Sequence, residues 1–367
     1  MSRVQPVATA SPVRYLARLE SAWAARNAPR LSSAPTVISL FAGGGGSSLG
    51  YQMAGFRELL AADWDENAVV TLRHNNPGLD VLHGDIAEQT VRDILVRTGL
   101  ATGELDVLDG SPPCQGFSMA GKRHLEDPRN SLFREFVRIL QGLQPRAFIM
   151  ENVAGMVKGK MRLVFVDCLQ SLKACGYDVS ARVLNAMYFG IPQQRQRLIL
   201  IGTRRDLNVA PSHPRPITAP HPLRDALGAA RLAPASHGEP VTLPPLDDRY
   251  GRLWDQVPLG GNASDVLGTG YSSCVKPHPD RPSPTLPKTQ TGRGFATVVH
   301  PFEPRALTIA EAAYTSSYPP AYHFVGSYTE RWARIGNSVP PLFMAAIASH
   351  VRNHLLGHDT VPVQDVA

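Results

Sequence analysis

The chain has 367 residues, of which 43% are hydrophobic, which is enough for two domains or for one large domain with an insertion. Its formal charge of +6 favours an acidic polymer as a partner, although a basic balance also fits an ordinary globular protein. The four cysteines share no CxxC spacing, no apolar run reaches the length of a membrane span, and arginines interrupt the apolar positions of residues 1–30. These features argue against a disulfide framework, a membrane protein and a secretory signal, so we expect a cytoplasmic protein.

Residues 12–26 place apolar and charged side chains on opposite sides of a helix, which predicts an amphipathic helix within an N-terminal extension, residues 1–35. The apolar run 36–41 then predicts a buried strand, which leads into the glycines 43–46 and a helix through Phe56. Such a turn lets a ligand approach the backbone and directs helix N–H groups at it. Neither a strict GxGxxG nor a following Gly-Lys-Ser/Thr is present, which disfavours a nucleoside triphosphate. A plain packing turn remains an alternative.

Two further strands end in acidic residues. Residues 59–62 precede Asp63 and Trp64, and residues 81–82 precede Asp85 and Ile86. A carboxylate about 20 positions after the first glycine is placed to bind a ribose diol, and Trp64 can stack on an adenine. The three strand ends together predict a site for an adenosine-bearing cofactor without a pyrophosphate.

The segment 109–118, with the sequence DGSPPCQGFS, places one cysteine directly after the apolar residues 105–108. Pro112 and Pro113 fix the backbone and remove two donors, so the segment cannot continue as a helix or an inner strand. Cys114 is therefore expected at the carboxyl edge of a sheet, where ligands bind in α/β proteins. A lone cysteine is more often a buried structural residue, but its polar neighbours favour an accessible nucleophile.

The next helix is expected at residues 131–142, and the next buried strand, at 147–150, ends in Glu151. An apolar setting disfavours the charged form of a carboxyl group, a property suited to sharing a proton with a ring nitrogen. Arg195 and Arg197 stand at alternate positions where another apolar strand begins, so they are predicted to share a face. A surface pair is the ordinary interpretation of Arg-x-Arg, but entry into an apolar strand favours contact with an anionic or carbonyl-rich ligand.

The regular alternation of strands and helices stops at residue 204. Prolines crowd the region 211–304, and its histidines have no metal-ligand spacing. Thr308, with an acid three residues later, predicts the start of a helix, and another apolar helix is expected from Pro341 through Val351. Residues 356–367 are expected to form a tail.

Four motifs occur in order along residues 36–355: Pro-Cys-Gln at 113–115, Glu-Asn-Val at 151–153, Gln-x-Arg-x-Arg at 193–197 and Gly-Asn-Ser-Val-Pro at 336–340. This series resembles the DNA cytosine-5 methyltransferases of the bacterial modification type. The resemblance implies an α/β fold with a Rossmann-like S-adenosylmethionine-dependent methyltransferase sheet, helices on both of its faces, and a small irregular target-recognition domain. It divides the chain into a catalytic and cofactor-binding domain, 36–203 and 305–355, and a recognition domain, 204–304. The chain departs from the family at 314–319, where an arginine and a Gln-Gly-Phe-Pro run are common.

The resemblance also implies the residues of the site. Cys114 and Glu151 would be catalytic, with Arg195 and Arg197 holding the target base. The residues matching S-adenosylmethionine contacts are Phe41, Gly43, Gly45, Gly46, Asp63, Trp64, Asp85, Ile86, Pro113, Leu132, Asn337 and Ser338. The residues expected to contact DNA are Gln115, Ser118, Lys122, Arg123, Thr285 and Leu286, with further contacts from Lys276, Arg281, Lys288 and Arg293. No metal is expected.

The implied reaction transfers a methyl group from S-adenosylmethionine to C5 of a cytosine flipped out of double-stranded DNA, through a covalent Cys114 adduct at C6. One alternative is an RNA (tRNA) cytosine-5 methyltransferase on the same scaffold, and another is a DNA-binding protein without catalysis. We expect a monomeric bacterial or phage enzyme that is functionally linked to a restriction endonuclease.

Overall fold

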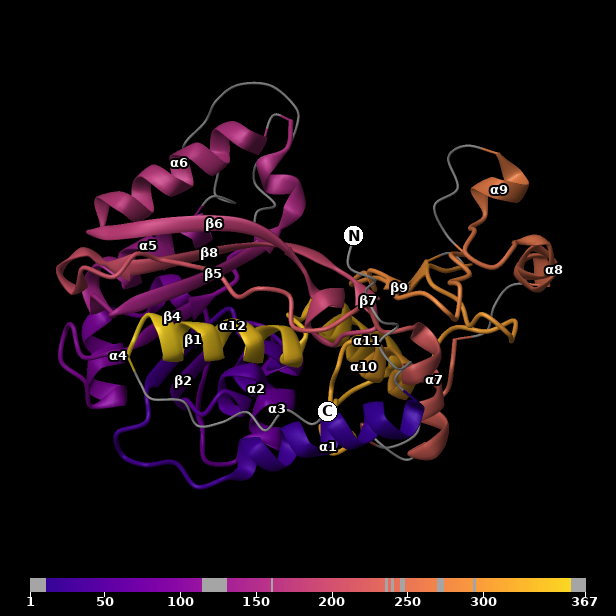
Figure 1. Ribbon diagram of the computed structural model, residues 1–367, viewed down its shortest axis with the longest axis horizontal. Helices are drawn as coiled ribbons and strands as arrows, with labels where there is room; N and C mark the ends of the chain where they lie inside the picture. Colours follow the sequence, from indigo (N-terminus) through magenta and orange to yellow (C-terminus); the bar gives the residue numbers. More distant parts are fainter. Residues whose placement is uncertain are drawn as a thin grey trace, which may run out of the picture. The chain divides into compact units, whose positions relative to one another are not determined.

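The computed structural model of the protein describes residues 11–113, 131–159, 161–234, 237–238, 241–244, 248–268, 274–292 and 295–357 (Figure 1). The chain divides into two compact units. One comprises residues 1–24, 186–195 and 216–343, and is called the 216–343 unit below. The other comprises residues 25–185, 196–215 and 344–367, and is called the sheet unit.

The sheet unit contains a seven-stranded sheet in the order β3-β2-β1-β4-β5-β8-β6. Its strands are β1 Thr36–Leu40, β2 Arg57–Asp63, β3 Asp80–His83, β4 Val107–Gly110, β5 Ala147–Val153, β6 Tyr177–Asn185 and β8 Gln196–Arg204. The strands β3, β2, β1, β4 and β5 are parallel, whereas β8 is antiparallel to both β5 and β6. The chain leaves β1 toward β3 on one side and resumes at β4 on the other, so the switch point lies between β1 and β4.

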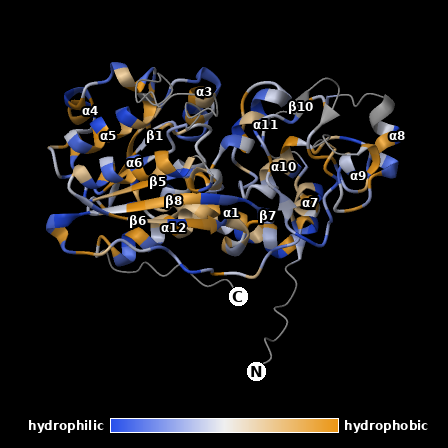
Figure 2. Cartoon of the chain, turned by 90° about the horizontal axis from the view of Figure 1, so that it is seen from above, coloured by the Kyte–Doolittle hydropathy of each residue, from blue (hydrophilic) through white to orange (hydrophobic). Residues whose placement is uncertain are grey.

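Helices cover both faces of this sheet, as expected from the sequence. They are α2 Gly46–Met53, α3 Glu66–Asn75, α4 Val91–Thr98, α5 Ser131–Leu143, α6 Met161–Ala174 and most of α12 Pro341–His354. Leu60 packs in a large core with side chains of α4, α5 and α6, whereas its neighbour Ala61 packs with Val69 and Leu72 of α3. Because successive side chains of a strand point to opposite faces, both faces of β2 are buried. Figure 2 shows hydrophobic residues along most of β5 and β8.

The elements largely match the expected ranges, with one shift that concerns the site. The apolar run 105–108 predicts a strand, but β4 begins at Val107 and extends through Asp109 to Gly110. The polar Asp109 therefore belongs to the strand and is buried in it. Hydrophobicity alone cannot predict that the strand includes Asp109. The backbone of β4 pairs with β1 at this position whatever side chain it carries.

The 216–343 unit has short elements around a buried polar and aromatic interior. Its helices are α7 Leu223–Leu232, α8 Asp248–Gln256, α9 Ser264–Leu267, α10 Ile309–Thr315 and α11 Tyr328–Asn337, and most of α1 Pro12–Asn27 belongs to it. Two strand pairs complete it, β7 Gln193–Gln194 with β9 Ser283–Pro284, and β10 Thr291–Gly292 with β11 Phe295–Ala296. The helix α7, which packs against α10, was not predicted from the sequence, because prolines lie on both sides of it and Gly228 lies within it. Residues 305–343, which the sequence assigned to the catalytic domain, therefore belong to the same compact unit as most of the region expected to recognise DNA.

No helix among the described residues has both the length and the apolar character needed to cross a membrane.

Candidate active site

The carboxyl ends of the central strands meet at one edge of the sheet. Leu40 at the end of β1 pairs in register with Ala62 of β2 and with Gly110 of β4. Gly110 in turn pairs with Met150 of β5. The residues that follow the paired positions are therefore neighbours: the glycine turn, Asp63, the Ser-Pro-Pro segment 111–113 and Glu151. The sequence predicts this edge as the site.

The glycine turn between β1 and α2 adopts an uncommon backbone. Phe41, Gly43 and Gly45 have φ values of 56°, 55° and 81°. For a bulky residue such as Phe41 this left-handed conformation is strained, and such strain is typical of functional sites. The Asp63 carboxylate stabilises the turn, accepting from Gly43 N at 2.7 Å and from Asp65 N at 2.9 Å. Asp63, expected to bind a ribose, thus also organises the backbone next to it.

This turn leaves space and hydrogen-bonding groups for a ligand. A Cβ atom added at Gly43 would meet no atom within 4 Å, so the backbone there borders open space. Gly45 caps α2 without a side-chain hydrogen bond, and because the first amides of a helix have no partner within it, they suit an anionic acceptor. Trp64 is 77% exposed, an unusual position for a large aromatic side chain and one from which it can stack on a planar ring.

The end of β3 contributes a second acid. The exposed Asp85 caps a short 3-10 turn by accepting from Ala87 N at 2.9 Å, and Ile86 behind it is buried. Phe41 and Leu132 are partly buried and pack against the main core. Glycine backbone, an exposed indole and two strand-end carboxylates fit the chemistry of an adenosine-bearing cofactor.

Glu151 has a cationic partner. Its Oε1 lies 2.7 Å from Nε of Arg197, and the two side chains are only 12% and 13% exposed. The antiparallel register of β5 and β8 places them together, because Val153 pairs with Arg197. The sequence suggested a carboxyl group in an apolar setting, whereas the structure gives it an arginine. The pair presents one acceptor group and one guanidinium side by side at the edge of the sheet.

Asn152 fixes the start of the cysteine segment. Its Nδ2 donates to the carbonyl of Pro112 at 3.1 Å, and its Oδ1 accepts from Val153 N at 2.8 Å. This bond holds the segment leading toward Cys114 beside the end of β5, where Glu151 lies. The sequence named Asn152 only as part of a motif, and its position between two strand ends explains what the amide does. Cys114, Gln115, Ser118, Lys122 and Arg123 lie outside the described residues, and Pro113 is the last described residue before them.

Arg195 differs from the sequence-based expectation. It lies between β7 and β8 and is 2% exposed, so the alternation that predicts a common face with Arg197 is broken there. Its guanidinium donates to the carbonyls of Leu286 at 3.1 Å and Gly336 at 2.9 Å. The buried side chain of Gln193 accepts from Leu286 N at 3.2 Å. Gln193 and Arg195 therefore hold the Thr-Leu-Pro segment 285–287 within the 216–343 unit, whereas Arg197 pairs with Glu151.

Two of the residues expected to contact DNA are buried. The Leu286 side chain is fully buried, so DNA contacts from this segment would have to come from exposed neighbours such as Thr285 and Lys288. The Lys276 ammonium lies 3.6 Å from the centre of the Trp254 ring and donates to the Trp254 carbonyl at 3.2 Å. A lysine that is 8% exposed and held this way supports the fold instead of a phosphate contact.

The last two expected cofactor residues belong to the 216–343 unit. Asn337 ends α11 and is exposed, while the buried Ser338 donates from Oγ to the carbonyl of Ile335 at 2.8 Å. Their part in cofactor binding stays a prediction.

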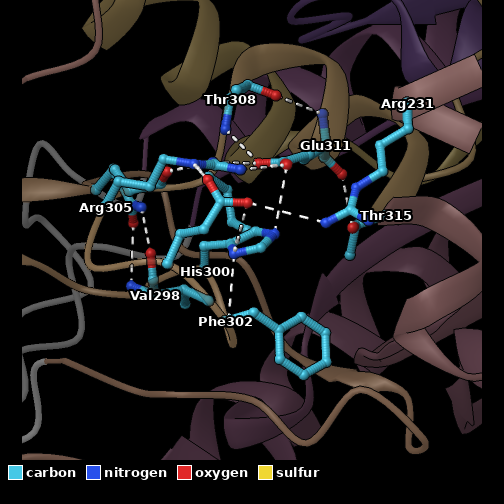
Figure 3. Close-up of polar contacts among 12 residues, drawn as sticks. Arg231, Val298, His300, Phe302, Arg305, Thr308, Glu311 and Thr315 are labelled. Atoms are coloured by element: carbon cyan, nitrogen blue, oxygen red, sulfur yellow. Dashed lines mark hydrogen bonds and ion pairs between the residues drawn. The ribbon is translucent and has the colours of Figure 1, made fainter. Parts of the chain in front are cut away.

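A partly buried ion network in the same unit lies at the start of α10 (Figure 3). Arg305 binds both carboxylate oxygens of Glu311 at 2.8 Å and also binds Glu303 at 2.7 Å. His300, fully buried, lies 3.6 Å from Glu311, and burial lowers the pKa of its imidazole. Thr308 and Glu311 form the capping box that the sequence predicts. The network connects the segment 300–305 to the start of α10.

Comparison with known proteins identifies similar chains. The sequence profile of the C-5 cytosine-specific DNA methylase family matches residues 35–238 and 256–353. Type II methyltransferase M.XorII of Xanthomonas oryzae pv. oryzae is 33% identical over 363 residues, covering 88% of this chain and 85% of that protein. Type II methyltransferase M1.HphI of Haemophilus parahaemolyticus is 33% identical over 331 residues, covering 86% of each.

Solved structures with a similar fold were also found. A DNA modification methyltransferase encoded within an E. coli prophage superposes with a TM-score of 0.67 at 25% identity, over 88% of this chain and 100% of that one. A variant of Spodoptera frugiperda DNMT2 superposes with a TM-score of 0.60 at 19% identity, over 88% of this chain and 100% of that one. The second similarity concerns the fold alone.

Proposed function

The chain belongs to the C-5 cytosine-specific DNA methylase family and is a methyltransferase, and from this premise we propose that it methylates C5 of a cytosine flipped out of duplex DNA, with S-adenosylmethionine as donor. The observation that supports this most is the arrangement at the sheet edge. Asn152 holds the segment leading to Cys114 beside the Glu151–Arg197 pair, and the strained glycine turn follows the adjacent strand β1.

The cofactor would be held by the residues around the glycine turn. The amides at the start of α2 suit its carboxylate, Asp63 and Asp85 suit hydroxyl and amine donors, and Trp64 can stack on the adenine. When bound, S-adenosylmethionine supplies an electrophilic methyl group on a sulfonium.

The protein must activate the cytosine, because C5 is too weak a nucleophile to take a methyl group unaided. The Cys114 thiolate forms a bond to C6, and the electron pair of the C5–C6 double bond shifts toward N3, which takes up a proton shared with Glu151, so C5 becomes an enamine-like carbon. C5 then takes the methyl group, and the electron pair of the broken carbon–sulfur bond stays on the leaving thioether. A base removes the C5 proton, the electron pair left at C5 expels the Cys114 sulfur from C6 as a thiolate, and the proton at N3 returns to Glu151. In this scheme Arg197, which is ion-paired with Glu151, donates to the base carbonyl.

The base must leave the helix, because a stacked cytosine cannot present its C6 face to a thiol. We assign sequence readout to the region 204–304, whose exposed groups include Thr285, Arg281 and Lys288. The names of the relatives further suggest that the chain acts in a bacterial restriction–modification system, together with a cognate endonuclease.

The test is covalent trapping. Bisulfite sequencing of DNA from cells that express the protein first identifies the methylated sequence. A duplex with 5-fluorocytosine at that position, incubated with S-adenosylmethionine, should then give a denaturation-resistant adduct that maps to Cys114. Cys114→Ser should give none. Absence of both methylation and adduct on duplex DNA, with methylation of tRNA instead, would favour the RNA alternative and contradict the proposal.

A further inference from the structure

A buried polar pair below the glycine turn has no part in the chemistry described so far. The Tyr51 hydroxyl, in α2, donates to Oδ1 of Asp109, in β4, at 3.2 Å. The two residues are 0% and 1% exposed. Burial of polar groups costs free energy unless they are hydrogen-bonded, and two apolar side chains of similar volume would serve stability alone at least as well. Their presence at this position therefore calls for a further role.

The pair connects the two parts of the proposed active site. Tyr51 lies on the helix that begins at Gly46, directly after the glycine turn. Asp109 pairs in register with Ser39 of β1 and precedes Cys114 by five positions. A bond from α2 to β4 thus fixes the cofactor turn relative to the strand that continues into the cysteine segment, across the switch point of the sheet.

The end of β4 is closely packed, so the strand cannot shift there to follow a displacement of α2. A Cβ atom added at Gly110 would lie 2.8 Å from two ring carbons of Phe136 in α5 and 3.5 Å from the Leu40 carbonyl. Close packing of this kind leaves no space for adjustment. The hydrogen bond from Tyr51 therefore reaches a fixed acceptor.

The surroundings of Asp109 favour its neutral acid form. Tyr51 and Ser47 of α2 face its carboxyl as hydrogen-bonding groups, while Glu58 of β2 and Glu151 of β5 are the acidic side chains that act on it electrostatically. Glu58 itself accepts from Ser39 Oγ at 2.7 Å and from Gln52 Nε2 at 3.0 Å. Burial raises the pKa of Asp109 well above its ordinary value, and the two acidic neighbours raise it further, against the lowering effect of the Tyr51 and Ser47 bonds.

We propose that Tyr51 and Asp109 are a positioning pair, in which Asp109 accepts from Tyr51 and so holds the glycine turn in register with the strand that leads into the Cys114 segment. This inference rests on the proposed function, because it assigns the turn to the cofactor and Cys114 to the target base. Neither residue touches substrate in this scheme, and both act through the elements that they join.

The test compares Tyr51→Phe with Tyr177→Phe as a matched control. Tyr177 is also fully buried and donates one hydrogen bond, to the Pro145 carbonyl at 2.7 Å, at the opposite edge of the sheet. Both variants should lower the urea midpoint of unfolding to a similar extent. Only Tyr51→Phe should also weaken S-adenosylmethionine binding in calorimetry, by about five- to tenfold for one lost buried bond, and lower kcat.

Two substitutions of Asp109 test its protonation state. Asp109→Asn keeps a neutral acceptor for Tyr51 and should bind S-adenosylmethionine within about twofold of the wild type, whereas Asp109→Leu should lose about as much affinity as Tyr51→Phe. The proposal is overturned if Tyr51→Phe matches Tyr177→Phe in affinity and kcat, or if Asp109→Asn is as impaired as Asp109→Leu. A wild type that binds S-adenosylmethionine but methylates no cytosine contradicts the proposed function alone, and the affinities still decide the role of the pair. A wild type that neither binds nor methylates overturns both.

Discussion

Two buried carboxyl groups, one in each unit, are accommodated in different ways. Glu311, 5% exposed, is bound through both oxygens by Arg305 in the 216–343 unit. Asp109, 1% exposed, accepts a hydrogen bond from a tyrosine hydroxyl in the sheet unit, and two further acids raise the pKa of its carboxyl group electrostatically. Burial alone therefore does not determine the charge of an acid. A fixed guanidinium stabilises a carboxylate, whereas burial beside other acids, without a cation, favours a protonated carboxyl group even against the opposing effect of hydroxyl donors.

Glu151 combines features of both regions. It lies at the same sheet edge as Asp109 and acts on it electrostatically, yet it is ion-paired with Arg197 as Glu311 is with Arg305. In the proposed function, the arginine that keeps Glu151 oriented also donates to the carbonyl of the target base. An ion pair in the 216–343 unit supports a segment of backbone, whereas an ion pair at the sheet edge can serve the reaction.

The largest effect is expected from Glu151→Gln. The amide still accepts from Arg197 but cannot share a proton with the cytosine ring, so the methylation rate should fall by about 10²- to 10⁴-fold. Single-turnover transfer of labelled methyl groups to the identified duplex measures it. The urea midpoint should change little. A rate within tenfold of the wild type would show that Glu151 is only a structural partner of Arg197.

Arg305→Met tests the ion-paired carboxylate. The substitution leaves Glu311 buried without its bidentate partner, and we expect a loss of about 3 kcal/mol in the free energy of unfolding, at the low end for a broken buried pair because Arg305 is partly exposed. Urea denaturation followed by fluorescence measures the loss. A loss in the free energy of unfolding smaller than that of an exposed pair would mean that His300 and Thr308 alone stabilise the buried Glu311.

Asp109→Asn tests the protonated carboxyl through pH. Because the folded protein raises the pKa of Asp109, the folded state binds more protons than the unfolded one above the ordinary value of 3.8. The stability that Asp109 contributes is therefore complete at acid pH and is lost as pH rises toward the folded-state pKa. Between pH 3.8 and the folded-state pKa, the free energy of unfolding of the variant should rise relative to that of the wild type by at most about 1.4 kcal/mol per pH unit, as measured by urea denaturation. A difference independent of pH would refute a protonated Asp109.

The smallest effect is expected from Arg97→Met, the surface control for Arg305→Met. Arg97 and Asp80 form an ion pair whose side chains are 41% and 37% exposed, so water and salt already screen it. Its loss should change the free energy of unfolding by only about 0.5 kcal/mol in the same urea assay. A cost equal to that of Arg305→Met would show that burial does not separate the two pairs.

The sequence by itself determined the strands, the glycine turn and the candidate acids of the sheet. Apolar runs predict β1, β2, β3 and β5 because strands buried on both faces must be apolar throughout. Glycines and acids directly after such runs predict a ligand edge, because parallel strands end on the same side. The motif series predicts the family for the same reason: each motif is local in the chain.

Only the tertiary structure decided which polar groups meet. Tyr51 and Asp109 are 58 positions apart, and they bond because β1 and β4 are neighbours in the sheet. Arg195 and Arg197 are two positions apart, yet they have different partners because the strand breaks between them. A local pattern records whether a side chain is buried, but its partner depends on which distant segment packs against it, and that contact exists only once the chain has folded.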